Sequence, residues 1–314
     1  MKVALFDVDS KIPNLALMKL SAYHKARGDS VELYQPLFID SYDWIYASTI
    51  FDFSDKSALI PERMAIGGTG WPDAKGLDLP GDIERMTPDY SLYGYAHSIG
   101  FTMRGCRLRC PFCVVPEKEG RPKPNNTIDE IWTQRDSDFI MLLDNDFFGN
   151  PEWPARIAEL QQLNLRVNFT QGLNIRNLKA EQAEALASIR FRSASGAENR
   201  VHFAWDDPRH EKLVRKGIAT ALEAGISARQ MQFYVLIGYW SSPTEDLHRV
   251  EVLRELGCDP YAMPYDRTDP YQRKFARWVN HKALFNSVSF ADYHGPRVKP
   301  QGVVNEDQLD LWAI

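Results

Sequence analysis

Short apolar runs alternate with helix-length segments over most of this chain, and that alternation restricts its fold more than any other feature. Beyond residue 94, six runs of strand length lie at 95–103, 139–143, 166–170, 201–205, 232–237 and 260–263. Helical patterns follow five of them, at 127–134, 154–163, 180–189, 211–224 and 243–256. Repeated strand–helix pairs predict an α/β fold with a parallel sheet. Six strands are too few for a closed eight-stranded barrel, so we expect a partial (β/α)6 barrel.

A smaller alternation of the same kind precedes the barrel. Its strand-length runs lie at 2–9, 31–35, 44–49 and 63–66. A helical pattern that begins after Asn14 and ends at Gly28 separates the first two runs. This order predicts a small Rossmann-like α/β domain. The expected organisation is therefore that domain at 1–75, a linker at 76–94, the barrel at 95–284 and a C-terminal extension at 285–314.

Charge and hydropathy indicate where such a chain works. The 314 residues carry a net charge of −5, and no apolar run reaches the roughly 18 residues that span a bilayer. The N-terminus becomes acidic at Asp7, too early for a signal peptide. We therefore expect a cytoplasmic protein with no membrane partner. In that reducing compartment, clustered cysteines indicate metal binding rather than disulfides.

Three of the four cysteines form one cluster, Cys106, Cys110 and Cys113, directly after the first predicted barrel strand. Three thiolates hold three irons of a [4Fe–4S] cluster and leave the fourth iron open, where the amine and carboxylate of an amino acid can chelate it. The alternative is a structural zinc site in a non-enzymatic module. Its fourth ligand would be a distant residue such as Cys258 or His97.

The segment 103–113, Met-Arg-Gly-Cys-Arg-Leu-Arg-Cys-Pro-Phe-Cys, resembles the signature loop of radical S-adenosylmethionine enzymes, including the aromatic Phe112 before the last cysteine. It is most similar to the branch that contains methylthiotransferases and cobalamin-dependent members. The resemblance implies that the open iron binds the methionine part of S-adenosylmethionine. An external flavodoxin- or ferredoxin-like donor supplies one electron, and the resulting 5′-deoxyadenosyl radical takes a hydrogen atom from the substrate.

The same resemblance assigns cofactor contacts to the loop after the second barrel strand. Enzymes of this family hold the methionine ammonium there, and this sequence has Asp144, Asn145 and Asp146. Asp144 and Asp146 are the candidates for that contact. The competing interpretation is a turn followed by a helix cap, in which Asp and Asn are common.

Polar residues after the later strands complete the predicted cofactor site. Gln171 and Asn174 are candidates for the ribose hydroxyls or the substrate, and Arg176 is a candidate for the methionine carboxylate. Either acid of the pair 206–207 contacts substrate or cofactor, or it caps the next helix. Gly238 lets the backbone approach adenine closely. For the loop residues the alternative is a purely local role in satisfying backbone groups.

The rest of the sequence argues against some of the reactions that enzymes of this family catalyse. Only Cys258 lies outside the cluster, which argues against a second cluster and hence against methylthiolation. The first domain resembles a degenerate cobalamin-binding fold, but its loop at 7–14 lacks the ligating histidine, which argues against cobalamin. The expected reaction is therefore isomerisation, epimerisation or oxidation of a small molecule. The alternative is rearrangement of a modified nucleic-acid base, because the compact chain resembles radical proteins of phages.

Overall fold

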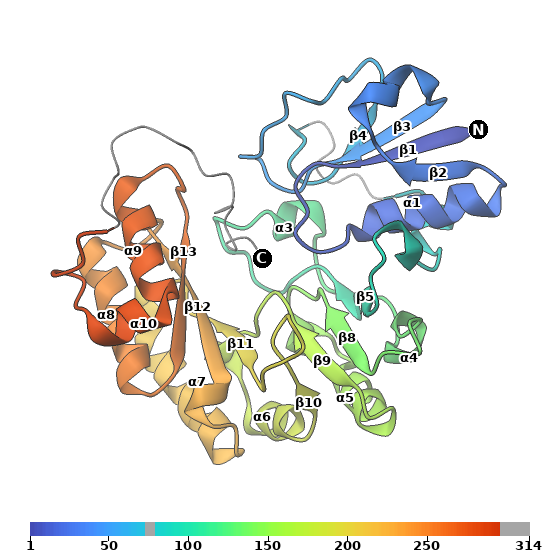
Figure 1. Cartoon of the computed structure of the whole chain (residues 1–314). Coiled ribbons are helices and arrows are strands. Elements are labelled where there is room, and N and C mark those ends of the chain that lie inside the picture. The colour runs from blue at the N-terminus through green and yellow to red at the C-terminus, as the bar shows by residue number, and fades with distance from the viewer. Residues whose placement is uncertain (73–78, 296–314) are drawn as a thin grey trace.

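The computed structural model describes residues 1–72 and 79–295, which form a mixed α/β structure with parallel sheets (Figure 1). The end of the predicted first domain, 73–75, the start of the predicted linker, 76–78, and most of the predicted C-terminal extension, 296–314, lie outside the described residues. In the described part of the chain, no helix is both long enough and apolar enough to cross a membrane.

The first 72 residues build a four-stranded parallel sheet with the strand order β2-β1-β3-β4. Its strands are β1 (Lys2–Asp7), β2 (Ser30–Leu33), β3 (Trp44–Ser48) and β4 (Ala65–Gly67). The predicted helix is α1 (Leu15–Ala26), and the Asn14 side chain caps it by accepting hydrogen bonds from two backbone amides. Gly28 follows with a φ of 82°, as a helix-ending glycine does. The four predicted strands and this helix are confirmed.

The described part of the predicted linker is fixed to its neighbours. It contains α2 (Gly81–Glu84) and a 3-10 turn (Tyr90–Leu92). The Lys19 ammonium on α1 donates to Glu84 Oε1 over 2.8 Å, and Ser21 Oγ donates to Asp89 Oδ2 over 2.6 Å. On the other side, Ile99 N donates to the Tyr90 hydroxyl over 2.9 Å. These contacts pack the segment against α1 on one side and against Ile99 on the other.

The rest of the chain forms two further parallel sheets. One has the order β10-β9-β8-β5, and the other has the order β11-β12-β13. The strands are β5 (Ser98–Gly100), β8 (Phe139–Leu142), β9 (Arg166–Phe169), β10 (Arg190–Phe191), β11 (Val201–Ala204), β12 (Met231–Ile237) and β13 (Asp259–Pro264). A parallel bridge between Leu173 and Phe203 joins the two sheets. Each of the six predicted strands overlaps one of these strands, and β10 is an addition two residues long.

The first predicted strand of this part, 95–103, is shorter than expected. β5 ends at Gly100, and β6 (Met103–Arg104) pairs antiparallel with β7 (Lys123–Pro124) outside the parallel sheet. A contact from a distant part of the chain accounts for the early end of this strand. The Met103 amide donates a 2.6 Å hydrogen bond to the buried Asp144 carboxylate. The chain therefore leaves the sheet just before the cysteines.

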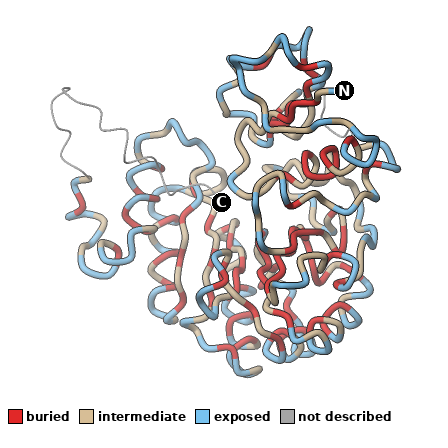
Figure 2. Tube along the Cα trace, turned by 45° about the vertical axis from the view of Figure 1, so that its right-hand side comes forward, coloured by how far each residue is buried: buried red, intermediate tan, exposed pale blue. Residues whose placement is uncertain are grey.

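All but the first of the following helices cover the outer faces of these sheets, and the first lies at their carboxyl edge, just after the cysteines (Figure 1). They are α3 (Val115–Lys118), α4 (Ile128–Ile131), α5 (Trp153–Gln162), α6 (Ala180–Ala187), α7 (Glu211–Glu223), α8 (Pro243–Glu255), α9 (Pro270–Asn280) and α10 (Lys282–Ser287). A capping box of Thr127 and Glu130 begins α4, within the segment 127–134 that was predicted as helical. Buried residues concentrate along the strands and on the helix faces that meet them (Figure 2). The buried side chains of Phe275 and Trp278 fix α9, which the sequence analysis did not predict, in the same core.

The first sheet lies over the carboxyl edge of the others (Figure 1). Tyr93, just before β5, donates its hydroxyl proton to Asp7 at the end of β1 over 2.6 Å. Lys118 Nζ of α3 donates to Thr69 Oγ1 over 2.6 Å. The Arg267 guanidinium, after β13, lies 4.4 Å from the centre of the Phe53 ring. The loops after β1, β3 and β4 thus face the loops in which the predicted site lies.

Candidate functional site

The cysteine loop lies at the carboxyl edge of β5, between β6 and α3. Cys106, Cys110 and Cys113 are all half-buried. The Cys106 amide donates to the Gly120 carbonyl over 3.3 Å, and the Cys113 amide donates to the Cys110 carbonyl over 3.0 Å. The Leu108 amide donates to the Cys106 sulfur over 3.3 Å. The backbone is thus folded around the thiols and supplies an amide hydrogen bond of the kind that tunes thiolate ligands.

Asp144 and Asp146, the predicted ammonium contacts, hold the cysteine loop in place. Asp144 accepts hydrogen bonds from the Met103 amide at 2.6 Å and from Thr102 Oγ1 at 3.0 Å. Asp146 accepts from the Arg107 guanidinium through Nε at 2.7 Å and Nη2 at 2.9 Å. Neither the turn nor the helix-cap interpretation describes these contacts, since both carboxylates reach across some 40 residues of sequence to the loop.

A third carboxylate, Glu119, has the same role and was missed in the sequence analysis. It accepts hydrogen bonds from the Gly105 amide at 2.8 Å, from Arg104 at 3.1 Å and from the predicted site residue Asn145 at 3.1 Å. Its side chain is 6% exposed. Glu119 lies in a polar, Pro- and Gly-containing stretch without periodicity, so no local pattern distinguishes it from an exposed loop residue.

Asp144 gives a pH-dependence prediction, because burial raises its pKa to about 7. In the unfolded chain an aspartate titrates near 4. Between about pH 4 and 7 the folded protein therefore binds a proton that the unfolded chain has lost, so Asp144 should lower stability as pH rises through this window, by up to about 1.4 kcal/mol per pH unit. Urea unfolding of the wild type and of Asp144→Asn across pH 4–8 measures this difference. Parallel stability curves for the two proteins would contradict the prediction.

The loop after β9 brings Arg176 to the cysteines. Asn174 Oδ1 accepts from the Arg176 amide at 3.1 Å and from Arg176 Nε at 3.2 Å, and Arg176 Nη1 lies 3.1 Å from His210 Nδ1. Burial raises the pKa of the Cys110 thiol, and the nearby Arg176 charge opposes that rise. Asn174 Nδ2 is buried without a hydrogen-bond partner in the described structure. Gln171 is exposed. Of these three predicted residues, Asn174 and Arg176 contact each other, and Arg176 is the one that acts on a thiol, that of Cys110.

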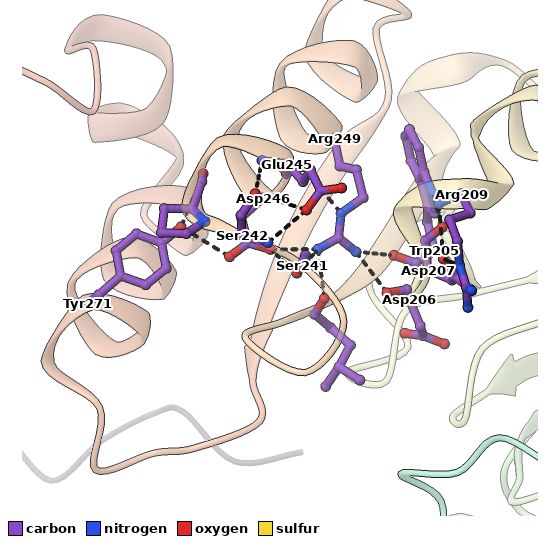
Figure 3. Close-up of polar contacts among 12 residues, drawn as sticks. Trp205, Asp206, Asp207, Arg209, Ser241, Ser242, Glu245, Asp246, Arg249 and Tyr271 are labelled. Carbon is purple, nitrogen blue, oxygen red and sulfur yellow. Dashed lines mark hydrogen bonds and ion pairs between the residues drawn. The ribbon is translucent and has the colours of Figure 1, made fainter.

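The two acidic residues that follow β11, Asp206 and Asp207, have different roles. Asp207 accepts hydrogen bonds from the Arg209 amide at 2.9 Å and from its guanidinium at 2.7 Å, so it caps the following turn. The Asp206 carboxylate points away from these contacts (Figure 3). Burial raises the pKa of Asp206 to about 6, and its negative charge helps to raise the pKa values of Cys110 and Cys113. Asp206 is therefore the acid of this pair that faces the cysteine loop.

Aromatic side chains gather beside the last cysteine. The centre of the Phe112 ring lies 5.7 Å from that of Tyr239 and 5.4 Å from that of Trp240, both after β12. The Tyr239 ring lies 4.7 Å from that of Tyr265, which follows β13 and is 53% exposed. The Arg209 guanidinium lies 5.7 Å from the centre of the Trp240 ring. This group of four rings offers an aromatic surface between the cysteine loop and solvent.

Gly238 occupies a position that other residues cannot take without strain. Its φ is 80°, and a Cβ there would overlap the Gln272 side chain, whose Oε1 accepts the Asp266 amide at 3.0 Å. Gly238→Ala should therefore lower the free energy of unfolding by about 1–3 kcal/mol more than the control Gly225→Ala. Gly225 has a similar φ of 95° but open space around it. Urea unfolding compares the two, and equal losses would show that Gln272 moves aside at no cost.

Two of the fourth ligands considered for a zinc site lie away from the cysteine loop. Burial is the main cause that raises the pKa of Cys106 to about 11, and the charges of Asp146, Cys113 and Cys110 act in the same direction. His97 and Cys258 precede β5 and β13 directly, so they lie at the amino edge of the parallel strands, opposite the cysteine loop. Neither can supply a fourth ligand. Among the described residues, no group of three or more His, Cys, Asp or Glu side chains forms a ready metal-ion site.

The loops of the first sheet satisfy their polar groups locally. Asp9 accepts hydrogen bonds from the Ile50 amide at 2.7 Å and the Phe51 amide at 2.9 Å. A Cβ at Gly68 would overlap the Thr49 carbonyl. The Gly-Gly-Thr-Gly segment 67–70, at the end of β4, therefore lets the backbone pack closely against the loop after β3.

No protein-family model and no curated protein matches this chain. The functional conclusion consequently rests on the residues and their arrangement.

Proposed function

We propose that this protein is a radical S-adenosylmethionine enzyme with a partial (β/α)6 barrel. One observation carries the proposal: three cysteines with the spacing of the family's signature loop lie at the carboxyl edge of parallel strands, where the loops after β9 and β11 bring Arg176 and Asp206 beside them. Ligand sites of α/β folds form at this edge, because the loops there converge from several strands. The cofactors are a [4Fe–4S] cluster on Cys106, Cys110 and Cys113 and S-adenosylmethionine; cobalamin is not part of the proposal.

Held by the three cysteines, a [4Fe–4S] cluster would supply the one electron that reductive cleavage of the S-adenosylmethionine C–S bond needs, which would give methionine and a 5′-deoxyadenosyl radical. The chain's own residues bind and orient the cofactor. Arg176 pairs with the methionine carboxylate through a charge-assisted hydrogen bond. The Asp206 carboxylate binds the methionine ammonium. Asp144 and Asp146, the candidates for this role in the sequence analysis, hold the cysteine loop through Met103 and Arg107 instead. The unpartnered Asn174 Nδ2 donates to a ribose hydroxyl.

Phe112 and the backbone turn at Gly238 contact the adenine of the cofactor. The aromatic surface beyond them contacts the substrate. Hydrogen abstraction from a small molecule leads to isomerisation, epimerisation or oxidation. A second candidate is rearrangement of a nucleic-acid base. The specific observation in its favour is the group of Tyr239, Trp240 and Tyr265 with the Arg209 guanidinium, since unstacked bases bind on aromatic rings and arginine planes.

Anaerobic reconstitution with iron and sulfide tests the proposal. The expected product is a brown protein with about four irons per chain, and its colour bleaches on reduction with dithionite. Incubated with S-adenosylmethionine and reductant, it should release 5′-deoxyadenosine. One tightly bound zinc per chain, with no iron uptake, would instead identify the non-enzymatic module.

A further inference from the structure

The sheet of β11, β12 and β13 is more open on the face away from its covering helices than on the face beneath them. Successive side chains of a strand point to opposite faces. On β12, Phe233 and Val235 are fully buried in the core with the helices, whereas Tyr234 between them is partly exposed. On β13, Ala262 is buried in the same core, and its neighbour Met263 is exposed. Space for a ligand therefore lies on the face away from the helices.

His202 of β11 lies on this open face and has an unused hydrogen-bonding atom. Its neighbours Val201 and Phe203 belong to the core beneath the helices, so the His202 ring points the other way. That ring stacks on the Tyr234 ring, with the centres 5.2 Å apart and the planes 5° apart. His202 is only 4% exposed, and its Nδ1 has no hydrogen-bond partner among the described residues. Because buried polar atoms are nearly always hydrogen-bonded, this nitrogen indicates a ligand contact.

Two tyrosine rings continue across the same face. Tyr234 and Tyr261 are partners in the register of β12 and β13, and their ring centres lie 5.9 Å apart. The Tyr234 hydroxyl donates to the Thr170 carbonyl over 3.4 Å, and the Tyr261 hydroxyl has no hydrogen bond within residues 1–72 and 79–295. We call His202, Tyr234 and Tyr261 the ring row. Both hydroxyls can still accept a hydrogen bond from a ligand.

The ring row lies beside the loop that carries Asn174 and Arg176. Thr170, which accepts the Tyr234 hydroxyl, comes directly before this loop. Within the loop, a Cβ added to Gly172 would lie 3.1 Å from the Tyr234 ring. A ligand on the ring row would therefore lie next to the residues proposed to bind the cofactor.

The ring row carries no charge at neutral pH. Burial lowers the pKa of His202 to about 4 and raises the pKa values of Tyr234 and Tyr261 above their ordinary value. The charges that act on His202 are those of Arg200 and Asp259, which form an ion pair with each other. A charged ligand group beside His202 would thus lose its hydration without gaining a counterion. An uncharged group is favoured there.

We propose that the ring row binds a nucleobase, which packs on the aromatic rings and pairs through its edge with His202 Nδ1. The inference names the substrate class and rests on the proposed function only in calling this ligand a substrate. A nucleobase edge carries N–H donors beside carbonyl acceptors, so it pairs with either tautomer of His202. A sugar has hydroxyl groups on all sides, most of which would stay unpaired against aromatic rings. The base belongs to a free nucleoside or to a nucleic acid from which it is turned out.

The test compares uridine with 3-methyluridine, in which a methyl group replaces the N–H in the middle of the base edge. Calorimetry measures the binding of both to the full-length protein before iron is added. Uridine should bind at least about tenfold more tightly, because the methyl group removes a buried hydrogen bond. A single-stranded oligouridylate and its 3-methyl form are the second pair. A preference shown only by the oligonucleotide assigns the base to a nucleic acid, whereas no preference in either pair would overturn the inference.

His202→Phe makes the matching change in the protein. Phenylalanine keeps a ring that stacks on Tyr234 but has no nitrogen, so the preference for the unmethylated ligand should disappear. His248→Phe is the control, because His248 lies on α8 with a side chain that is 56% exposed. The control should keep the wild-type preference. A folded His202→Phe protein that also kept it would contradict the proposal, and if that variant does not fold, the two ligand pairs on the wild type decide alone.

These measurements need no iron, reductant or S-adenosylmethionine, so their failure is distinct from failure of the proposed function. A protein that takes up zinc and no iron would refute the radical reaction and leave the binding result valid. A protein that forms 5′-deoxyadenosine but binds neither ligand pair with a preference would refute the ring-row inference alone.

Discussion

Cys110→Ala is expected to abolish both the iron cluster and the release of 5′-deoxyadenosine. Two remaining thiolates leave a second iron without a protein ligand, and the cluster then loses the single open position to which S-adenosylmethionine binds. Iron should fall from about four per chain to a small, variable content. The measurements are iron and sulfide analysis after anaerobic reconstitution, followed by chromatographic detection of 5′-deoxyadenosine.

Cys258→Ala is the matched control, because Cys258 is the one cysteine outside the cluster. It is 5% exposed, and burial raises the pKa of its thiol to about 12, as expected of a core residue. The control should lose some stability but keep its iron and its activity. If Cys110→Ala kept wild-type iron and product, or if Cys258→Ala lost both while remaining folded, the assignment of the ligands would be wrong.

Arg249→Met is expected to cause the largest loss of stability. The Arg249 side chain is fully buried and pairs with the fully buried Asp246 at 2.6 Å. It also donates to the carbonyls of Trp205 and Asp206 at 3.0 Å and of Leu236 at 2.9 Å (Figure 3). Removing the guanidinium leaves a buried carboxylate unpaired, which costs about 3–5 kcal/mol. The free energy of urea unfolding measures this loss.

Arg215→Met is the control for this prediction. Arg215 also pairs with a carboxylate, Glu211 at 2.7 Å, but its side chain is 42% exposed. Such surface pairs contribute about 0–1 kcal/mol. The double variant Arg249→Met/Asp246→Asn should recover part of the loss, because no unpaired charge remains buried. Equal losses for the two single variants would show that the buried pair contributes no more than an exposed one.

The Arg249 contacts also connect stability to the proposed site. The carbonyls that Arg249 binds belong to the ends of β11 and β12, so it fixes the strand ends that carry Asp206 and Gly238. Neither Arg249 nor Asp246 was a candidate in the sequence analysis, which predicted the segment 243–256 only as a helix. Their importance depends on a contact across more than 40 residues.

The cysteine motif and the strand–helix order could be read from the sequence because both are local properties. Apolar periodicity identifies a strand or a helix within a few residues, and a cluster of three thiols is visible as a spacing. The strand 95–103 shows the limit of such patterns. No Pro or charged residue interrupts this segment, yet Met103 lies outside the parallel sheet, and its amide donates to the Asp144 carboxylate.

The roles of the polar site residues were decided by tertiary structure. Asp144, Asp146 and Asp206 are all acids at strand ends, and the sequence offers no means of ranking them. In the folded chain the first two bind the cysteine loop, while Asp206 keeps its carboxylate free of those contacts. The sequence alone therefore determined most of the strands and helices and the position of the thiols in the chain, although it missed α9 and the short strand β10. The folded structure decided which carboxylates meet which partners, because hydrogen-bond and ion-pair partners come from segments far apart in the chain.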